Sequence, residues 1–287
     1  MPHEIRLMTY NIRKGKGANG HAKNSMSKMA EALERLDVDL LLCQEVFHGG
    51  SEGFGQSEHL ARQLRMNSYY GANKFRQVGH HGNTTLTRLK VERFENHDIS
   101  TNPLEKRGAL YVRLKYNGGG LHVFNVHFGL NKTQRLRQLA QIESMVPERC
   151  TRGEPVVLAG DFNDWNRSLD RAVVERLGFR NAFADLKDRE TRTWHARRPL
   201  FGLDRIYVKN LTVNKVERLN GEPWSELSDH LPLLADLGAG SQQIAQVIDP
   251  FSSTGPAADS TGYGNNTSIT VTMNQRKTLM TGVRKPK

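Results

Sequence analysis

Hydrophobic positions along this chain follow two spacings, one typical of strands and one typical of helices. Compact apolar runs predict seven strands, at residues 5–12, 38–43, 109–114, 121–127, 156–160, 204–208 and 231–237. Apolar residues three or four positions apart predict helices at 26–36, after a possible Ser25 cap, at 136–145, after Thr133, and around 169–177. The strands are apolar enough to need cover, so the pattern predicts an α/β layered fold with helices over the sheet faces.

The periodicity ends after Leu237, where a stretch rich in Gly, Ser, Thr, Asn and Gln begins. We therefore expect one domain at residues 1–238 and a low-complexity tail at 239–287. The tail has too few large apolar residues to offset the entropy of ordering, so we expect it to be disordered. An edge strand at Ser268 to Met273 is the less favoured alternative.

Composition limits the partners and the location of the protein. The 287 residues carry a net charge of +11, of which the body before residue 241 holds +8, from 36 basic and 28 acidic residues. This excess favours polyanions, either nucleic acid or an anionic membrane surface. Cys43 and Cys150 are the two cysteines, which excludes a disulfide framework and a cysteine-rich metal site. No transmembrane run or secretory signal is visible, so we expect a cytoplasmic protein.

Polar side chains recur at the ends of the predicted strands. Asp161 and Asn163 close the run VVLAGDFN, and the two-residue repeat of a strand predicts that both project from one face. Each such residue, taken alone, is explained by a turn, a cap or a solvated loop. Together they are the ingredients of a divalent-metal hydrolase. The set comprises Asn11, Glu45, His127, Asp161, Asn163, Asp204, Asp229 and His230.

Six short motifs resemble, in order, those of the endonuclease/exonuclease/phosphatase family. They are TYNIR at 9–13, QE at 44–45, NVHFGL at 125–130, GDFND at 160–164, LDRIYV at 203–208 and SDH at 228–230. The resemblance covers residues 5–237, and GDFN with a distant SDH is its most specific part. It implies a four-layer sandwich: two mixed β-sheets packed face to face, with helices outside. The segments HHGNTTLTR, EKRGALYVRL and VHFGL further resemble a bacterial branch, some of whose genes lie beside those of cardiolipin synthases.

The resemblance also implies a metal site and an oriented histidine. Glu45 would be the principal Mg²⁺ ligand, with Asn11 nearby and Asp229 close to the ion, and Mn²⁺ could substitute. Asp204 would hold His230, which would act on the attacking water or on a phosphoryl oxygen. The cation would neutralise developing charge and lower the pKa of bound water.

Further residues would handle the phosphate. Asp161 and Asn163 would position the water and the scissile phosphate, and His127 would donate a hydrogen bond or protonate the leaving group. Which residue is the general base is left open. Asn83 and Arg107 match positions of the same bacterial branch, and either could bind the phosphate.

Some residues near these motifs have two readings. The basic residues of loop 13–16 could contact flanking phosphates or could simply be solvated. His80 and His81 could bind a transition metal, although two adjacent histidines are weak evidence. Trp194 could stack on a base or enter a membrane interface, but packing against a strand is the simpler use.

Three functions are compatible with this pattern. The first is a Mg²⁺-dependent endonuclease or exonuclease, supported by the basic body and by His127. The second is a phospholipid phosphodiesterase or a phosphatase of small molecules, which the absence of an amphipathic helix or long apolar hairpin disfavours. The third is a non-enzymatic binding scaffold, which is disfavoured because all eight polar residues are present. No protein partner is predicted.

Overall fold

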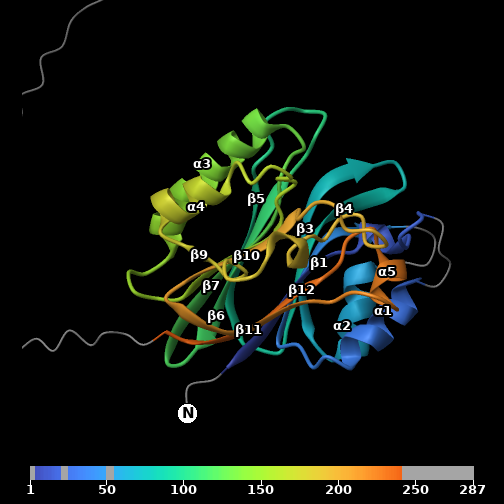
Figure 1. Ribbon diagram of the computed structural model, residues 1–287, viewed down its shortest axis with the longest axis horizontal. Helices are drawn as coiled ribbons and strands as arrows, with labels where there is room; N and C mark the ends of the chain where they lie inside the picture. Colours follow the sequence, from blue (N-terminus) through green and yellow to red (C-terminus); the bar gives the residue numbers. More distant parts are fainter. Residues whose placement is uncertain (1–3, 21–24, 50–54, 241–287) are drawn as a thin grey trace, which may run out of the picture. The chain divides into compact units, whose positions relative to one another are not determined.

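Two six-stranded β-sheets form the centre of the molecule (Figure 1), in a computed structural model that describes residues 4–20, 25–49 and 55–240. The first sheet has the order β11-β12-β1-β2-β4-β3 and the second has the order β5-β6-β7-β8-β10-β9. The first sheet comprises β1 (Ile5–Asn11), β2 (Leu40–His48), β3 (Asn67–Arg76), β4 (Gly79–Thr87), β11 (Leu211–Arg218) and β12 (Leu233–Ala239). The second comprises β5 (Val91–Asp98), β6 (Gly108–Tyr116), β7 (Gly119–His127), β8 (Val156–Asp161), β9 (Arg180–Asn181) and β10 (Asp204–Lys209).

Helices cover the outer face of each sheet. Helices α1 (Ser25–Glu34), α2 (Gln56–Leu64) and α5 (Trp224–Leu227) lie on the first sheet, and α3 (Lys132–Arg149) and α4 (Asp170–Leu177) lie on the second (Figure 1). Two short 3₁₀ segments, Arg13–Gly15 and Asp188–Glu190, lie in loops. The layers are therefore helix, sheet, sheet and helix, and the predicted α/β sandwich is confirmed.

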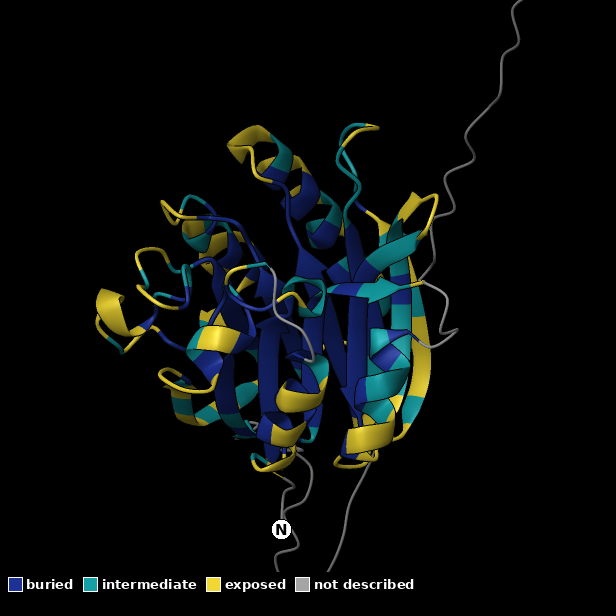
Figure 2. Ribbon diagram, turned by 90° about the vertical axis from the view of Figure 1, so that its right-hand side faces the viewer, coloured by how far each residue is buried: buried dark blue, intermediate teal, exposed yellow. Residues whose placement is uncertain are grey.

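The two-residue repeat explains why the central strands are apolar throughout. Leu7 packs between the sheets, whereas its neighbour Met8 faces the helices of the first sheet. In the second sheet Val123 lies between the sheets and Phe124 packs under α3 and α4. Both faces of these strands are thus removed from water, and Figure 2 shows the buried strands between partly exposed helices.

Each sheet contains one parallel pair near its middle, and this sets the position of the site. β1 pairs with β2 in parallel, and β7 pairs with β8 in parallel, while the other pairings are antiparallel. The carboxyl ends of parallel neighbours lie at the same edge of a sheet. The polar residues that follow these four strands are therefore gathered at the ends of two adjoining pairs.

All seven predicted strands are present, but the sequence pattern missed others. The strands β3, β5 and β11 carry more polar and half-exposed side chains, so their apolar pattern was weak. Helix α3 is capped two residues before Thr133: Asn131 Oδ1 accepts the backbone N–H of Thr133 at 2.8 Å, and Gln134 completes a capping box. Strand β12 ends at Ala239, one residue beyond the expected boundary, and the expected tail and its alternative edge strand lie outside the described residues.

Candidate active site

Three neighbouring strands of the second sheet present catalytic-type side chains side by side. His127, the last residue of β7, lies in register with Asp161, the last residue of β8. Asp161 in turn lies opposite Asp204, the first residue of β10. All three side chains are buried, so the strand register alone places a histidine and two carboxylates in a row at one sheet edge.

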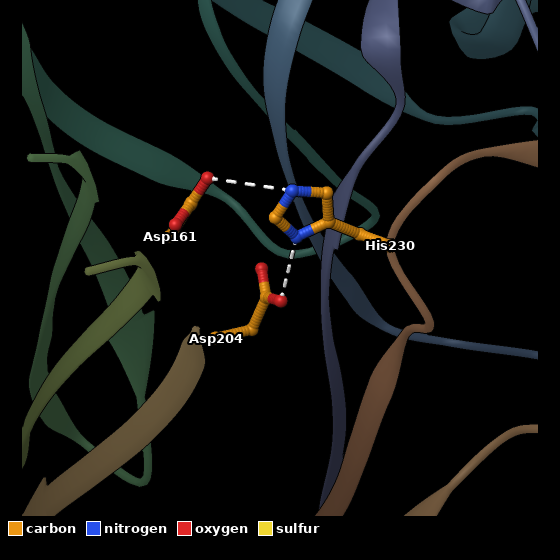
Figure 3. A group of neighbouring side chains, drawn as sticks. All are labelled: Asp161, Asp204 and His230. Atoms are coloured by element: carbon orange, nitrogen blue, oxygen red, sulfur yellow. Dashed lines mark hydrogen bonds and ion pairs between the residues drawn. The ribbon is translucent and has the colours of Figure 1, made fainter. Parts of the chain in front are cut away.

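His230 completes this row from the loop that precedes β12. Its Nδ1 lies 2.9 Å from Asp204 Oδ2, and its Nε2 lies 3.8 Å from Asp161 Oδ2 (Figure 3). His127 Nε2 approaches the same Asp161 oxygen at 3.4 Å. One carboxylate oxygen of Asp161 therefore faces two imidazoles, one of which is oriented by a second buried carboxylate.

Asn11 links the two sheets at this point. Its side-chain amide donates to Asp161 Oδ2 at 2.9 Å, and its own oxygen accepts the backbone N–H of Arg13 at 3.1 Å. The backbone oxygen of Asn11 accepts the hydroxyl of Ser228 at 2.6 Å. The end of β1 is thereby fixed against both the SDH segment and the end of β8.

Asp161 and Asn163 both reach the site, but the physical reason differs from the one expected. Strand β8 ends at Asp161, and Asn163 has a left-handed backbone with φ of 48°. Its N–H donates to Asp161 Oδ1 at 2.9 Å, and its side-chain amide donates to the carbonyl of Phe128 at 3.0 Å. An Asx-type turn, not the alternation of a strand, brings the two side chains into the same cleft.

A β-bulge directs Glu45 into the site. The pairing of β2 with β4 shifts between Cys43 and Val46, and Glu45 has a φ of 53°. Bulges are common beside active sites because the extra residue changes the direction of a side chain. The other residue in the bulge, Gln44, is buried and donates to Asn125 Oδ1 at 2.8 Å, which ties the two sheets together beneath the site.

The surroundings of His230 and His127 shift their pKa values in opposite directions. Burial lowers the pKa of His230, but Asp204 and Asp161 outweigh it and raise the pKa to about 10. Burial and the nearby Arg107 lower the pKa of His127 well below its ordinary value. At neutral pH His230 is therefore a protonated hydrogen-bond donor, whereas its surroundings disfavour the protonated form of His127.

The carboxylates respond in opposite directions. Burial raises the pKa of Asp161 to about 6, against the opposing charge of His230 and with a further contribution from Asp204. Burial also acts to raise the pKa of Glu45, but His127 and Lys14 lower it to about 2. Asp161 can thus exchange a proton near neutrality, whereas Glu45 stays ionised.

Two carboxylates at the cleft are neutralised by cations of the same short segment. Lys14 forms an ion pair with Glu45, and Arg13 Nε lies 3.3 Å from Asp229 Oδ2. Both cations belong to the 3₁₀ segment that follows Asn11, and both have positive φ values. Glu45 and Asp229 are both partly accessible and line the same cleft, and carboxylate oxygens are the ligands that suit a hard divalent cation.

Asp161, Asp204 and His230 are a second candidate group of metal ligands, and their ligand atoms lie close together. Within the described part of the chain, Asp161, Asp204 and His230 are the three potential ligands that lie within 4.8 Å of one another. However, His230 Nδ1 and Asp204 Oδ2 already bind each other at 2.9 Å, and a hard divalent cation prefers oxygen ligands. The donor chemistry therefore fits a cation at Glu45 and Asp229 better than at this triad.

The residues line a cleft of about 570 Å³. Seven of the ten site residues predicted from the sequence border it, namely Glu45, Arg107, His127, Asp161, Asn163, Asp229 and His230. Asn11 and Asp204 lie directly behind them, each hydrogen-bonded to a lining residue. Asn83 does not line this cleft: it is buried, and its amide donates to the backbone carbonyls of Gly108 and Asn125 at 3.1 Å each, which joins the sheets.

Large apolar side chains complete the walls of the cleft, and sequence reasoning singled out only one of them. Trp165, Trp194, Phe201, Leu130 and Leu203 all border it. Trp194 was noted in the sequence, and its ring stacks on that of Phe201 at a centroid distance of 6.2 Å. The position of Trp165, directly after the GDFND motif, was the available signal for a second wall residue.

His80 and His81 lie on opposite faces of β4, because successive strand residues alternate. The ring of His80 stacks on His48 at 4.8 Å between centroids, while His81 borders a groove that also contains Glu45. Burial and the charge of Lys14 lower the pKa of His81 to about 4. The two adjacent histidines therefore cannot chelate one metal ion.

Comparisons with known proteins identify the family of this chain. The model of the endonuclease/exonuclease/phosphatase family matches residues 8–230. The uncharacterized protein YbhP of Escherichia coli is 35% identical over 244 residues, which covers 81% of this chain and 96% of YbhP.

Solved structures share the fold at low identity. An endonuclease/exonuclease/phosphatase from Beutenbergia cavernae has a TM-score of 0.70 at 18% identity and covers 83% of this chain and 72% of its own. A mannosyl-6-phosphatase from Bacteroides thetaiotaomicron has a TM-score of 0.66 at 19% identity, covering 81% and 99%. TDP2 from Caenorhabditis elegans has a TM-score of 0.62 at 20% identity, covering 82% and 75%. With the matched family model and the YbhP relative, the chain belongs to the endonuclease/exonuclease/phosphatase family and is a phosphoric ester hydrolase.

Proposed function

We propose that this protein is a Mg²⁺-dependent phosphodiesterase that cleaves its substrate by direct, in-line attack of water. The observation that supports this most is the position of His230, whose Nδ1 is held by Asp204 at 2.9 Å while its Nε2 faces the Asp161 carboxylate at 3.8 Å in the cleft. A fixed cationic donor beside a carboxylate that can accept a proton near neutrality suits hydrolysis of an anionic ester.

The metal would be held by Glu45 and Asp229, with the amide oxygen of Asn11 beside them. When bound, the cation would neutralise phosphate charge and make bound water more acidic. Mn²⁺, which also prefers oxygen ligands, would substitute. Lys14 and Arg13 would exchange these carboxylates for the phosphate groups of the substrate.

The chain's own residues supply the remaining steps. Asp161, with its pKa near 6, accepts the proton of the attacking water, and Asn163 fixes the position of the phosphate. His230 donates a hydrogen bond to a phosphoryl oxygen, where negative charge builds up. His127 lies on the other side of Asp161 and donates to a phosphate oxygen or to the leaving group, and Arg107 lies at the mouth to bind the phosphate.

The wall of Trp165, Trp194 and Phe201 can hold a flat or apolar substrate group beside the scissile bond. Nucleic acid, the substrate class placed first from the charge of the body, is compatible with stacking on this wall. A phospholipid, the second class, is compatible with the same chemistry and is favoured by an observation outside the cleft, described below.

The reaction is tested with bis(p-nitrophenyl) phosphate, which needs neither a base nor a lipid tail. We expect hydrolysis that requires Mg²⁺ or Mn²⁺, stops with chelator and falls at least about 100-fold in Asp161→Asn and His230→Ala. Glu154→Gln, which alters a histidine-carboxylate pair at His122 outside the cleft, is the matched control and should retain activity. Full activity in excess chelator, or in both site variants, would refute the proposal.

A further inference from the structure

A second, larger groove opens next to the catalytic cleft. It has a volume of about 730 Å³ and shares Glu45, Arg107 and Leu130 with the cleft. Its walls come from the β3–β4 hairpin on one side and from the loop between β5 and β6 on the other. A substrate bound at the catalytic residues would extend directly into this groove.

The groove is strongly basic. Apart from the shared Arg107, its cationic residues are Lys14, Lys16, Lys74, Arg76 and Lys106, against the acidic Glu45 and Glu105. Among the described residues, Lys16 and Arg76 form no ion pair with a carboxylate. The surface therefore keeps uncompensated positive charge and complements an anionic partner.

Aliphatic side chains project at the same rim. Val78, at the turn of the hairpin, is 73% exposed, and Leu104, in the opposing loop, is 83% exposed. Leu130 borders both cavities and is also exposed. Phe75, on the other face of the hairpin, is 72% exposed. Large apolar side chains grouped on protruding loops indicate an interaction surface.

The two loops that carry these side chains are braced. Phe75 and His80 of the hairpin and His48 of the adjoining β2 are cross-strand neighbours, with ring centroids 5.2 Å and 4.8 Å apart along the row. Lys74 Nζ donates to the carbonyl of Leu104 at 3.1 Å, which joins the hairpin to the opposing loop. The exposed side chains are thus presented on fixed supports, and little ordering is needed when they bind.

We infer that this rim docks on an anionic phospholipid membrane and feeds a lipid phosphodiester into the catalytic cleft. Lys16, Arg76 and Lys106 would contact lipid phosphates, while Val78 and Leu104 would enter the acyl boundary. Aliphatic tips cannot stack on bases, so a nucleic acid would leave them in water, whereas a membrane removes them from it. The inference rests on the proposed function for the catalytic step, but the docking is measured separately from catalysis.

Docking is tested by sedimentation of the full chain with vesicles in chelator, so that no hydrolysis occurs. Vesicles of phosphatidylcholine mixed with phosphatidylglycerol should bind the protein, and pure phosphatidylcholine should bind it far less. The double variant Val78→Ser/Leu104→Ser should weaken binding about tenfold, since partial burial of two aliphatic groups is lost. Arg76→Gln and Lys106→Gln should each weaken it about fivefold, the contribution of one cation near an anionic surface.

Matched controls come from α4, which does not line the groove. Val174→Ser removes another exposed valine, and Arg171→Gln removes an exposed arginine; both variants should bind vesicles like the wild type. Equal binding of the groove and control variants would overturn the inference. A second outcome would also overturn it: a single-stranded oligonucleotide abolishes vesicle binding, and Val78→Ser/Leu104→Ser leaves the affinity for that oligonucleotide unchanged. The groove would then be a nucleic-acid site.

Hydrolysis separates this inference from the proposed function. The double variant should hydrolyse bis(p-nitrophenyl) phosphate like the wild type, yet release less phosphate product from anionic vesicles. A wild-type protein that binds vesicles but hydrolyses no phosphodiester would refute the proposed function and leave the docking intact. A protein that hydrolyses the soluble ester but ignores vesicles would refute the docking alone.

Discussion

Replacing Asp204 with asparagine tests whether His230 acts as a cation. The raised pKa of about 10, against the ordinary 6.5, corresponds to about 5 kcal/mol of preference for the protonated form. Asp204 is the largest favourable contribution and also holds Nδ1 by a 2.9 Å hydrogen bond. Because an adjacent opposite charge shifts a pKa by about 1–3 units, Asp204→Asn should lower the pKa of His230 by about 2 units or more.

The assay combines an NMR titration of histidine-labelled protein with steady-state kinetics on bis(p-nitrophenyl) phosphate. In the variant, kcat should fall about 100-fold or more, because a donor to the charged phosphate is weakened and its ring is no longer oriented. Glu154→Gln disturbs the His122 pair, joined at 2.7 Å, and serves as control for the loss of any buried histidine partner.

Stability gives an independent check with a defined sign. A histidine whose pKa is raised in the folded state stabilises that state fully below pH 6.5 and loses the effect as the pH rises through about 10. The stability difference between wild type and Asp204→Asn should therefore shrink across this window in urea unfolding. A wild-type His230 that titrates near 6.5, or a variant with unchanged pKa and kcat, would refute the assignment.

Four further results are expected. Glu45→Gln should weaken Mg²⁺ binding at least about tenfold in titration calorimetry, since it removes a carboxylate ligand; unchanged affinity would exclude Glu45 as a ligand. Lys14→Met should instead tighten Mg²⁺ binding about fivefold in the same measurement, because a competing cation worth about 1 kcal/mol is gone, and weaker binding would contradict this competition. Asn125→Leu should lower the free energy of unfolding by about 3 kcal/mol in urea, because buried polar groups of both sheets lose their partners, and an unaffected midpoint would show that this link is dispensable. Burial acts to raise the pKa of Glu154, but a hydrogen bond from His122 helps to hold it at about 2. The stability that this carboxylate contributes is therefore present above pH 4.5 and is lost as the pH falls toward 2. Glu154→Gln should remove this part of the acid dependence in thermal unfolding.

Strand periodicity made much of the framework predictable. The central strands β1, β2, β7, β8 and β10 are apolar on both faces because helices and the opposing sheet cover them, and such runs are visible in a sequence. The edge strands β3, β5 and β11 were missed because one or both of their faces meet water, and the polar side chains there interrupt the apolar pattern that predicts a strand.

Within residues 4–20, 25–49 and 55–240, no helix is long and apolar enough to cross a membrane.

The residues of the site were likewise predictable in part. Polar residues at strand ends identified Asn11, His127 and Asp161, because a buried strand places its terminal side chains at a sheet edge. Asn83 shows the limit of such reasoning, since its motif pointed to a phosphate while its amide is occupied by two backbone carbonyls between the sheets. Sequence cannot show which hydrogen bonds a buried amide makes.

The sequence by itself determined the layered fold, the family and the residue types that carry the chemistry, because periodicity and strand-end motifs are local properties. Only the tertiary structure decided how those residues act. The protonation of His230 depends on Asp204 and Asp161 from separate strands, and the direction of Glu45 depends on a bulge opposite β4. The basic groove with Val78 and Leu104 at its rim exists because a hairpin of one sheet meets a loop of the other, and spacing along the chain does not encode that proximity.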